Sequence, residues 1–317
     1  MKSVQFSNGD QMPMLGLGTW KSEPGDVIVA VKEAIRLGYR HIDCALIYGN
    51  ETEIGEALSE SFQEGLVTRD QMWITSKLWN DAHAAADVQP AVEKSLADLQ
   101  LDYLDLYLMH WPVALKKGVF FPESAADMIS LDALPLSETW EAMEGLVDKG
   151  LCRHIGVSNF STAKLNELIK VARLKPEMNQ NELHPYLQQP DMLALCKNYG
   201  IHLTAYSPLG SLDRPEGLKV AGEPILLEDA VITTIAERHG ITAAQVLLSW
   251  GLQRGVAVIP KSVNSGRMKE NLAAAEVTLT QEDMQAIANI DQHRRYVDGA
   301  FWALDGGAYT QANIWDE

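Results

Sequence analysis

The chain has 317 residues and a formal net charge of −17 at pH 7. That charge argues against a nucleic-acid partner, because phosphates are bound by clustered lysine and arginine side chains. No apolar run approaches the roughly 18 residues that a membrane span needs, and residues 1–15 lack the apolar centre of a signal peptide. We therefore expect a globular, cytoplasmic protein with no nucleic-acid partner and no membrane segment.

The chain has three cysteines, Cys44, Cys152 and Cys196. They are far apart, odd in number and set among apolar neighbours, so they form neither a disulfide framework nor a zinc-binding spacing. We expect three buried free thiols and no bound metal.

Short apolar segments alternate with segments of helical period along the whole chain. The predicted strands are 15–19, 39–43, 72–78, 103–110, 152–158, 176–181, 201–207 and 256–260. The predicted helices are 26–37, 51–63, 87–99, 137–149, 162–172, 190–199 and 229–239. Such alternation indicates a parallel sheet. Eight strands in this length favour a closed (β/α)8 barrel, a TIM barrel, that forms one domain over residues 1–317.

Four further segments belong to the two ends of this barrel. Residues 4–15 carry Asn8-Gly9 between two short β-like runs. Asn-Gly favours the type I′ turn of a tight hairpin, and we expect this hairpin to cover the bottom of the barrel. The segments 112–136 and 207–227 and the tail from about 293 are longer than a connection needs. Lids and binding loops occur in such segments, so we expect these at the top.

Polar residues stand where the predicted strands end. They are Asp43, Lys77, His110, Ser158 with Asn159, Gln180, Tyr206 and Lys261. The C-terminal ends of barrel strands form the rim on which active sites are built. A lysine within the apolar stretch WITSKLW (73–79) would be costly to bury without a partner. Polar residues at seven strand ends of one rim therefore indicate a functional site.

The stretch HIDCALIYGNE (41–51) places Asp43 at a strand end and Tyr48 just beyond it. Taken alone, it fits a helix-capping aspartate and a packed tyrosine. With Lys77 and His110 on the same rim, it fits a proton-donating set. A lysine ammonium lowers the pKa of a neighbouring phenol from its usual value near ~10, and an aspartate holds that lysine charged. A histidine orients a carbonyl oxygen, so the set predicts protonation of that oxygen as hydride reaches carbon.

Three stretches resemble the signatures of the aldo-keto reductases, and most closely those of aldehyde and aldose reductases. They are GYRHIDCALIYGNE (38–51), LDYLDLYLMHWP (101–112) and IPKSVNSGR (259–267). The similarity runs from LGLGTW (15–20) to about Arg295, and Cys44 is a small departure where serine or threonine is more usual. The resemblance implies that Tyr48 is the general acid of carbonyl reduction. The four catalytic residues that it implies are Asp43, Tyr48, Lys77 and His110.

A Rossmann site is not indicated, because GLGTWK (16–21) lacks the third glycine and no suitably placed acidic residue follows. The resemblance instead implies a nicotinamide cofactor extended across the rim. Ser158, Asn159 and Gln180 would hold its carboxamide, and Tyr206 would stack on its ring. The implied cofactor residues are Gly18, Thr19, Trp20, Ser158, Asn159, Gln180, Tyr206, Ser207, Leu209, Ser211, Lys261, Ser262, Arg267, Glu270 and Asn271.

The segment PKSVNSGRMKEN (260–271) distinguishes NADP(H) from NAD(H). Lys261, Ser262 and Arg267 place two cations and a hydroxyl in one strand-to-helix turn, which suits a phosphate monoester. In the family this segment binds the adenosine 2′-phosphate, with Glu270 and Asn271 near the adenine. A solvated basic turn is the other reading. A basic cluster beside the four implied catalytic residues, in a chain of net charge −17, favours NADP(H).

Aromatic residues of the rim and the long segments are expected to line an apolar substrate pocket. Together with His110, the residues assigned to it are Trp20, Trp79, Trp111, Phe121, Phe301 and Trp302. Trp140 and Trp250 lie in helical patterns and are expected in the core. The tail departs from known versions of the family, so it leaves the substrate open among aromatic or medium aliphatic aldehydes, 2-oxo esters and open-chain sugars. Arg294 and Arg295 would either attract an acidic group or remain solvated.

Two other functions stay open. One is a regulatory barrel that binds NADPH without turnover, against which the intact Tyr48, Lys77 and His110 weigh. The other is a metal-dependent hydrolase that would use His110, His184 and Asp43 as ligands, although no second cluster joins them. Relatives of this subgroup are commonly monomers, and we expect a monomer.

Overall fold

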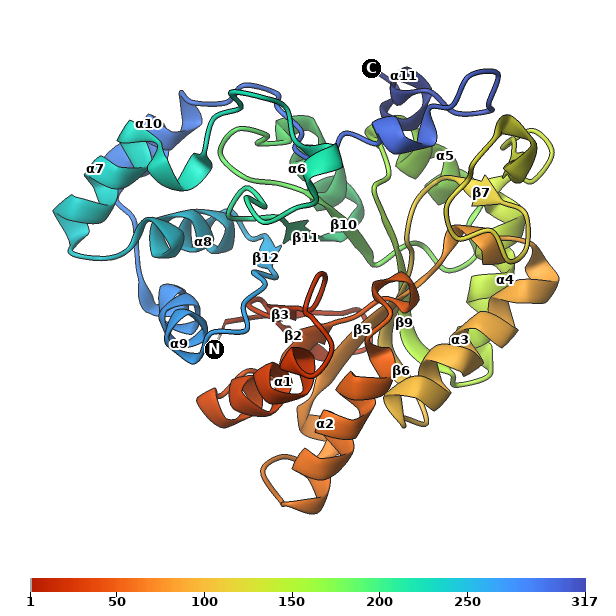
Figure 1. The fold of residues 1–317 in the computed structure, drawn as a ribbon, viewed down its shortest axis with the longest axis horizontal. Coiled ribbons are helices and arrows are strands. Elements are labelled where there is room, and N and C mark those ends of the chain that lie inside the picture. The colour runs from red at the N-terminus through yellow and green to blue at the C-terminus, as the bar shows by residue number, and fades with distance from the viewer. Residues whose placement is uncertain (1) are drawn as a thin grey trace.

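A parallel sheet of eight strands forms the centre of the computed structural model, which describes residues 2–317 (Figure 1). The strand order is β12-β11-β10-β9-β6-β5-β4-β3, and every neighbouring pair is parallel. The strands are β3 (Leu17–Gly18), β4 (His41–Asp43), β5 (Trp73–Leu78), β6 (Leu104–Met109), β9 (Cys152–Ser158), β10 (Met178–Glu182), β11 (His202–Tyr206) and β12 (Ala257–Val258). Backbone bonds join the two ends of this order, because Gly16 N donates to Val258 O at 2.9 Å and Val258 N donates to Met14 O at 2.7 Å. The sheet therefore closes into the predicted barrel.

Helices surround the strands (Figure 1). They are α1 (Asp26–Leu37), α2 (Glu51–Gln63), α3 (Ala85–Leu99), α4 (Leu136–Asp148), α5 (Thr162–Val171), α6 (Pro190–Tyr199), α7 (Ala230–His239), α8 (Ala243–Gln253), α9 (Ser265–Ala273), α10 (Gln281–Ala288) and the short α11 (Gln311–Trp315). The seven predicted helices correspond to α1–α7. The sequence placed Trp250 of α8 in a helical pattern but gave this helix no bounds, because residues 246–252 are all buried and no polar face marks them.

The N-terminal hairpin covers the bottom of the barrel, as predicted. It pairs β1 (Ser3–Gln5) with β2 (Gln11–Pro13), and the ring of Phe6 packs against those of Trp73 and His154 at centroid distances of 4.9 and 4.3 Å. The predicted type I′ turn is wrong. Only Gly9 has positive φ, and Phe6 N donates to Asp10 O at 2.9 Å across a longer connection.

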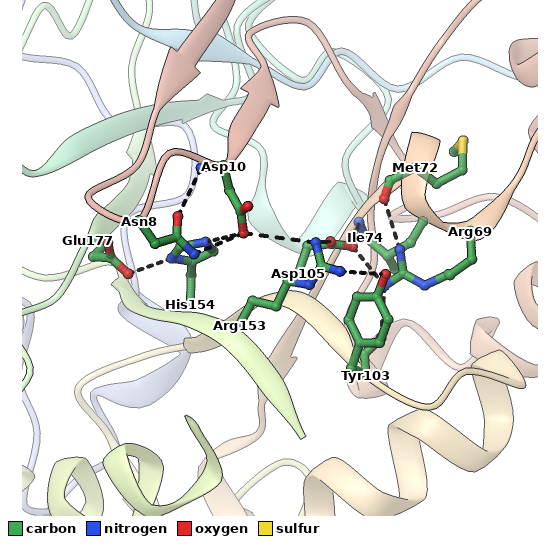
Figure 2. A network of polar contacts seen from close by, with 10 residues as sticks. All are labelled: Asn8, Asp10, Arg69, Met72, Ile74, Tyr103, Asp105, Arg153, His154 and Glu177. Atoms are coloured by element: carbon green, nitrogen blue, oxygen red, sulfur yellow. Dashed lines mark hydrogen bonds and ion pairs between the residues drawn. The ribbon is translucent and has the colours of Figure 1, made fainter. Parts of the chain in front are cut away.

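A charged cluster ties this hairpin to the barrel (Figure 2). The imidazole of His154 in β9 contacts Glu177 Oε2 at 2.6 Å through Nδ1 and Asp10 Oδ2 at 3.1 Å through Nε2. Burial acts to lower the pKa of His154, but the two carboxylates raise it above its usual value. We call Asp10, His154 and Glu177 the base triad.

A second part of the same network surrounds Tyr103 (Figure 2). Its ring carries a guanidinium on each side, with Arg69 at 4.0 Å and Arg153 at 4.3 Å from the centroid. Arg69 also donates to the buried carboxylate of Asp105 at 2.7 Å, and that carboxylate accepts from Ile74 N at 2.8 Å. These bonds fix the starts of β5 and β6.

The long segments are only partly irregular. Segment 112–136 contains a small antiparallel pair, β7 (Ala114–Leu115) and β8 (Met128–Ile129), and the tail contains α11. Trp140 and Trp250 lie in the core as predicted, with 1% and 2% of their surface exposed. Within residues 2–317, no helix has the length and apolar content that crossing a bilayer requires.

Candidate active site

The residues predicted at the rim come together there. Asp43 ends β4, Lys77 is the penultimate residue of β5, and His110 directly follows β6. Ser158 ends β9 and Tyr206 ends β11, whereas Gln180 lies in the middle of β10. Parallel barrel strands all end on one face, and this common direction brings these side chains together.

Lys77 is the centre of the site. Its ammonium donates to Asp43 Oδ2 at 2.7 Å, to the backbone oxygen of Cys44 at 2.8 Å and to Tyr48 Oη at 3.3 Å. Gln180 Nε2 donates to the other oxygen of Asp43 at 2.7 Å. Lys77 and Asp43 expose 0% and 2% of their surface, so this is a fully buried ion pair. An ammonium has three donors, and here all three have acceptors.

The charge of Lys77 is therefore secure. Burial acts to lower the pKa of Lys77, but Asp43 and Tyr48 together raise it above its usual value. The side chain stays an ammonium at any pH at which the protein is folded and Asp43 is ionised.

Tyr48 lies in a one-turn 3-10 helix, Leu46–Tyr48, between β4 and α2. Burial of the phenol raises the pKa of Tyr48 to about 12, and the ammonium of Lys77 opposes this rise. Lys77 thus acts in the predicted direction, but the predicted net lowering is wrong because desolvation outweighs it. Tyr48 stays a neutral phenol near neutral pH. Since its oxygen accepts from Lys77, its own proton remains available to donate.

His110 packs beside the ring of Tyr48. Its ring lies edge-on to that of Tyr48 at a centroid distance of 5.8 Å and to Trp79 at 5.1 Å. Burial and the Lys77 ammonium together hold the pKa of His110 well below its usual value. The imidazole is therefore neutral and suited to hydrogen bonding rather than to carrying charge.

The residues predicted to hold a carboxamide form one connected set beside Tyr48. Asn159 Nδ2 donates to His110 O at 2.9 Å, and Asn159 Oδ1 accepts from Tyr206 Oη at 2.7 Å. Ser158 Oγ donates to Gln180 O at 2.7 Å. Asn159 has φ 61°, a left-handed conformation that asparagine tolerates better than most residues. The set offers amide and hydroxyl groups at fixed positions.

Two lysines and an aspartate bridge the opening between β3 and the segment that follows β11. Lys21 Nζ pairs with Asp213 Oδ1 at 2.7 Å and donates to Ser211 Oγ at 3.3 Å, and Lys261 Nζ lies 3.4 Å from Asp213 Oδ2. Ser207 and Ser211 both have positive φ, uncommon for serine. Sequence reasoning named Lys261, Ser207 and Ser211 but missed Lys21 and Asp213. Their only local signal is charge in otherwise ordinary loops.

The predicted phosphate-binding turn leads from β12 into α9. The side chain of Asn264 caps this helix by accepting from Arg267 N at 3.0 Å. The guanidinium of Arg267 is exposed and has no ion pair with any residue in the described range 2–317. Ser262 and Asn271 are buried, while Glu270 is exposed. A free cation beside helical N–H groups can bind a phosphate.

The remaining cofactor residues of the prediction lie in or after β3 and in the segment after β11. Thr19 Oγ1 donates to the backbone oxygen of Asp43 at 2.8 Å, and a Cβ on Gly18 would come within 2.7 Å of Ile259 O. Gly18 therefore permits the close approach of β3 to the segment after β12. Trp20 is partly buried beneath the Lys21 ammonium, 4.3 Å from the ring centroid. Leu209 is partly buried against the main core.

The predicted metal ligands of the hydrolase alternative do not converge. His184 Nε2 contacts Glu182 Oε1 at 2.8 Å, whereas Asp43 is bound by Lys77 and Gln180. Over the part of the chain that the structure describes, no three His, Cys, Asp or Glu side chains are grouped to hold a metal ion.

Comparisons with known proteins decide the family. Residues 14–292 match the model of the Aldo/keto reductase family. The chain belongs to this family. It is 56% identical over 317 residues to the aldo/keto reductase slr0942 of Synechocystis sp., covering 100% of this chain and 97% of that relative. It is 48% identical over 296 residues to aldo-keto reductase family 1 member A1 of Homo sapiens, covering 93% and 90%.

A solved structure of the aldose reductase from Schistosoma japonicum has the same fold, with a TM-score of 0.87 at 39% identity over 96% of this chain and 97% of that one. The predicted family and the predicted barrel are thus confirmed. As an aldo/keto reductase, the protein is an oxidoreductase of a family that uses nicotinamide cofactors and acts on small carbonyl compounds. The roles of individual residues, the single domain, and a cytoplasmic monomer stay predictions.

The top of this aldo/keto reductase carries a second hydrophobic cluster, separate from the barrel core. Its buried members are Trp79, Trp111, Val113, Leu115, Met128, Val297, Trp302, Tyr309, Ile314 and Trp315. Trp302 is fully buried between Trp79 and Trp111, at centroid distances of 5.8 and 5.9 Å. Phe301 lies 5.5 Å from Trp111, and Phe121, largely exposed, lies 5.8 Å from Trp79. The structure thus groups the predicted pocket residues except Trp20, which lies outside this cluster.

The end of the tail is the part of the site that sequence reasoning missed. Trp315 in α11 packs edge-on against Trp111 at 5.8 Å, and the guanidinium of Arg295 covers its other side at 3.8 Å. Arg295 also pairs with Glu317 at 2.7 Å and its side chain is only 10% exposed, so it is not the solvated arginine of the second alternative. Thr310 caps α11 in a capping box with Asn313, a signal that could have revealed the helix.

Proposed function

We propose that the protein is an NADP(H)-dependent aldehyde reductase that converts aldehydes and activated ketones to alcohols, with Tyr48 as general acid. The observation that carries this proposal is the saturated ammonium of Lys77, which holds one buried aspartate and one protonated phenol at once. A barrel that only bound a cofactor would have no use for a phenol placed in this way.

The donor set of the rim fits a nicotinamide dinucleotide that carries a 2′-phosphate. Amide and hydroxyl groups of Ser158, Asn159 and Gln180 would hold the carboxamide, and Tyr206 would face the nicotinamide ring. At the far end, Lys261 and Arg267 would bind the phosphate, beside the N-terminus of α9. When bound, the cofactor supplies the hydride.

The chain itself supplies the proton and the geometry. Tyr48 would donate its proton to the substrate oxygen as negative charge develops there, since an alkoxide is a stronger base than a phenolate even with a phenol pKa of about 12. Lys77 would stabilise the phenolate left behind, and Asp43 would keep Lys77 in place. Neutral His110 would hydrogen-bond the same oxygen and set its direction.

The aromatic cluster at the top supports substrates with an apolar body. Trp79 packs edge-on against His110, and the aromatic contacts continue from it to Phe121, Trp302, Trp111 and Phe301, so aromatic or medium aliphatic aldehydes are proposed first. 2-Oxo esters and open-chain sugars are the second group.

The cofactor assignment has a direct test in Arg267→Ala. Loss of a guanidinium that binds phosphate should weaken NADPH binding by about 10- to 100-fold, a typical loss for a charge-assisted contact. NADH lacks that phosphate, so its affinity should change little. Fluorescence titration of both cofactors measures this, and Lys269→Ala, also exposed in α9, is the matched control. Equal losses for both cofactors would reject the phosphate assignment.

The activity is tested by NADPH consumption over a panel of benzaldehyde-like aldehydes, succinic semialdehyde, 2-oxo esters, methylglyoxal and open-chain sugars. Each assay is repeated with NADH. Turnover of aldehydes with NADPH, and weaker turnover with NADH, is the expected result. Tight NADPH binding without turnover of any carbonyl would favour a regulatory barrel instead.

A further inference from the structure

Glu51, the first residue of α2, is a buried carboxylate that the mechanism above does not use. It exposes 3% of its surface. One of its oxygens accepts from Ser76 Oγ at 2.5 Å and the other accepts from Ser95 Oγ at 2.8 Å. Both serines are fully buried, Ser76 in β5 and Ser95 in α3. The carboxylate therefore joins three elements of the barrel wall.

Two of these attachment points are neighbours of the proposed acid. Ser76 directly precedes Lys77 in β5, and Tyr48 lies three residues before Glu51. The bond from Ser76 to Glu51 consequently joins the same two segments that the contact from Lys77 to Tyr48 joins. Between Tyr48 and Glu51, Gly49 has φ 70° and ends the 3-10 turn.

The turn that carries Tyr48 needs such an anchor. It is a single 3-10 turn, and the side chain of Tyr48 within it is only partly buried. Besides the contact from Lys77, the nearest side-chain hydrogen bond in the chain is that of Asn50, two residues after Tyr48. Asn50 Nδ2 donates to Thr19 O at 2.9 Å. Short 3-10 turns have poorer hydrogen-bond geometry than α-helices, so they depend on outside contacts for a fixed position.

We propose that Glu51 is a positioning residue that holds the Tyr48 turn against β5 through Ser76, and so keeps the Tyr48 hydroxyl at the Lys77 ammonium. This inference rests on the proposed function, in which Tyr48 is the proton donor. Glu51 itself touches neither Tyr48 nor the substrate oxygen and acts through the backbone of the turn.

A carboxylate suits this position for two reasons. Its two oxygens accept from two hydroxyl donors without bringing a donor that would itself need an acceptor. It also stands in the first turn of α2, where the helix dipole favours negative charge. Burial raises the pKa of Glu51 above its usual value, and the hydroxyls of Ser76 and Ser95 oppose this rise. The other charges that act on it are Asp98 of α3 and Lys77 of β5.

The two serines provide a matched pair of variants. Ser76→Ala and Ser95→Ala each remove one hydroxyl donor from the same buried carboxylate, so their general structural cost should be similar. Only Ser76→Ala cuts the link between the Tyr48 turn and β5. We expect Ser76→Ala to lower kcat by about 10- to 100-fold, as displacement of a reacting group does, while Ser95→Ala lowers it by less than about threefold. NADPH affinity should be unchanged in both.

The pH dependence of kcat separates positioning from a loss of folded protein. Weakened contact between Tyr48 and Lys77 should shift the pH at which kcat declines in Ser76→Ala, and not in Ser95→Ala. Ser76→Thr keeps the hydroxyl and should restore most of kcat. If Ser76→Ala does not fold, Glu51→Asp, which keeps the charge but shortens the side chain, takes its place and should lower kcat in the same way.

The outcomes are distinguishable. A greater loss of kcat with Ser76→Ala than with Ser95→Ala, rescued by threonine, supports the proposal. Equal effects of the two alanine variants, or full kcat in Ser76→Ala or Glu51→Asp, overturn it. If Tyr48→Phe keeps turnover, the proposed function itself fails. If Tyr48→Phe is inactive while the serine variants behave alike, only the positioning role is wrong.

Discussion

The two ends of the barrel each hold a buried charged cluster, and the clusters differ in their access to water. At the rim, Lys77 and Asp43 are both within 2% of complete burial. At the base, His154 is equally buried, but the side chains of Asp10 and Glu177 are 30% and 25% exposed (Figure 2). The rim pair is thus closed to solvent, whereas two carboxylates of the base triad are partly open to it.

Two histidines show what this difference does. Burial and the Lys77 ammonium push the pKa of His110 far down, so the rim histidine stays neutral. At the base, Glu177 and Asp10 overcome burial and raise the pKa of His154. The neighbouring charges, rather than burial alone, decide the direction. The two histidines are therefore shifted in opposite directions, His110 toward the neutral form and His154 toward the charged form.

Among the changes that test this comparison, Lys77→Met should lower the free energy of unfolding most. Methionine has a similar length but leaves Asp43 buried without a counter-ion, and loss of one partner of a buried pair costs about 3–5 kcal/mol. The free energy of unfolding, measured in denaturant, should fall by that amount, and turnover should be lost as well. Lys170→Met is the control, since the pair of Lys170 with Glu167 is exposed and is expected to contribute at most about 1 kcal/mol. Equal costs of the two changes would mean that the rim pair has no special role in stability.

His154→Gln tests how the base triad contributes to stability at different pH. Because the pKa of His154 is raised on folding, its contribution is fully present below its unfolded value of about 6.5 and is lost as pH rises through the folded value. The pKa values of Asp10 and Glu177 are lowered, so their contribution is lost only in acid. Wild-type stability should decline as pH rises above about 6.5 and through the raised folded pKa of His154, and this decline should be smaller in the variant.

Denaturant unfolding at several pH values measures this effect, which should be smaller than that of Lys77→Met. Arg153 and His202 also face the base triad and remain in both proteins, so the difference between the two curves reports His154. Parallel curves for wild type and variant would show that His154 does not titrate in this range. Turnover at neutral pH should be unaffected, since the base lies at the opposite end of the barrel.

The grouping of polar residues at the rim could be predicted because one barrel brings all strand ends together. Asp43, Lys77 and His110 each follow from a local pattern, an apolar strand that ends in a polar residue, and the fold supplies their proximity. No such rule pairs Asp10 with His154, which are 144 residues apart and lie at the strand starts. Asp213 was missed for a similar reason, because its partners come from other loops.

The net pKa of a buried group is a second property that the sequence alone could not predict. The chemistry of Tyr48 and Lys77 gives the sign of their interaction, but the net pKa of Tyr48 depends on desolvation, which only the folded environment sets. Helix α8 lacks a polar face, and α11 lies in a tail with little apolar periodicity. The bounds of α8 needed the tertiary structure, whereas the capping pair Thr310 and Asn313 was a local signal for α11.

The most direct test of the account is Tyr48→Phe, compared with wild type for NADPH binding and for turnover of an aldehyde from the panel. The change removes one hydroxyl while the ring remains. NADPH affinity should stay nearly unchanged, and kcat should fall by at least about 10²- to 10⁴-fold, the usual contribution of a general acid. Retained turnover in this variant would contradict the assignment of Tyr48 as the proton donor.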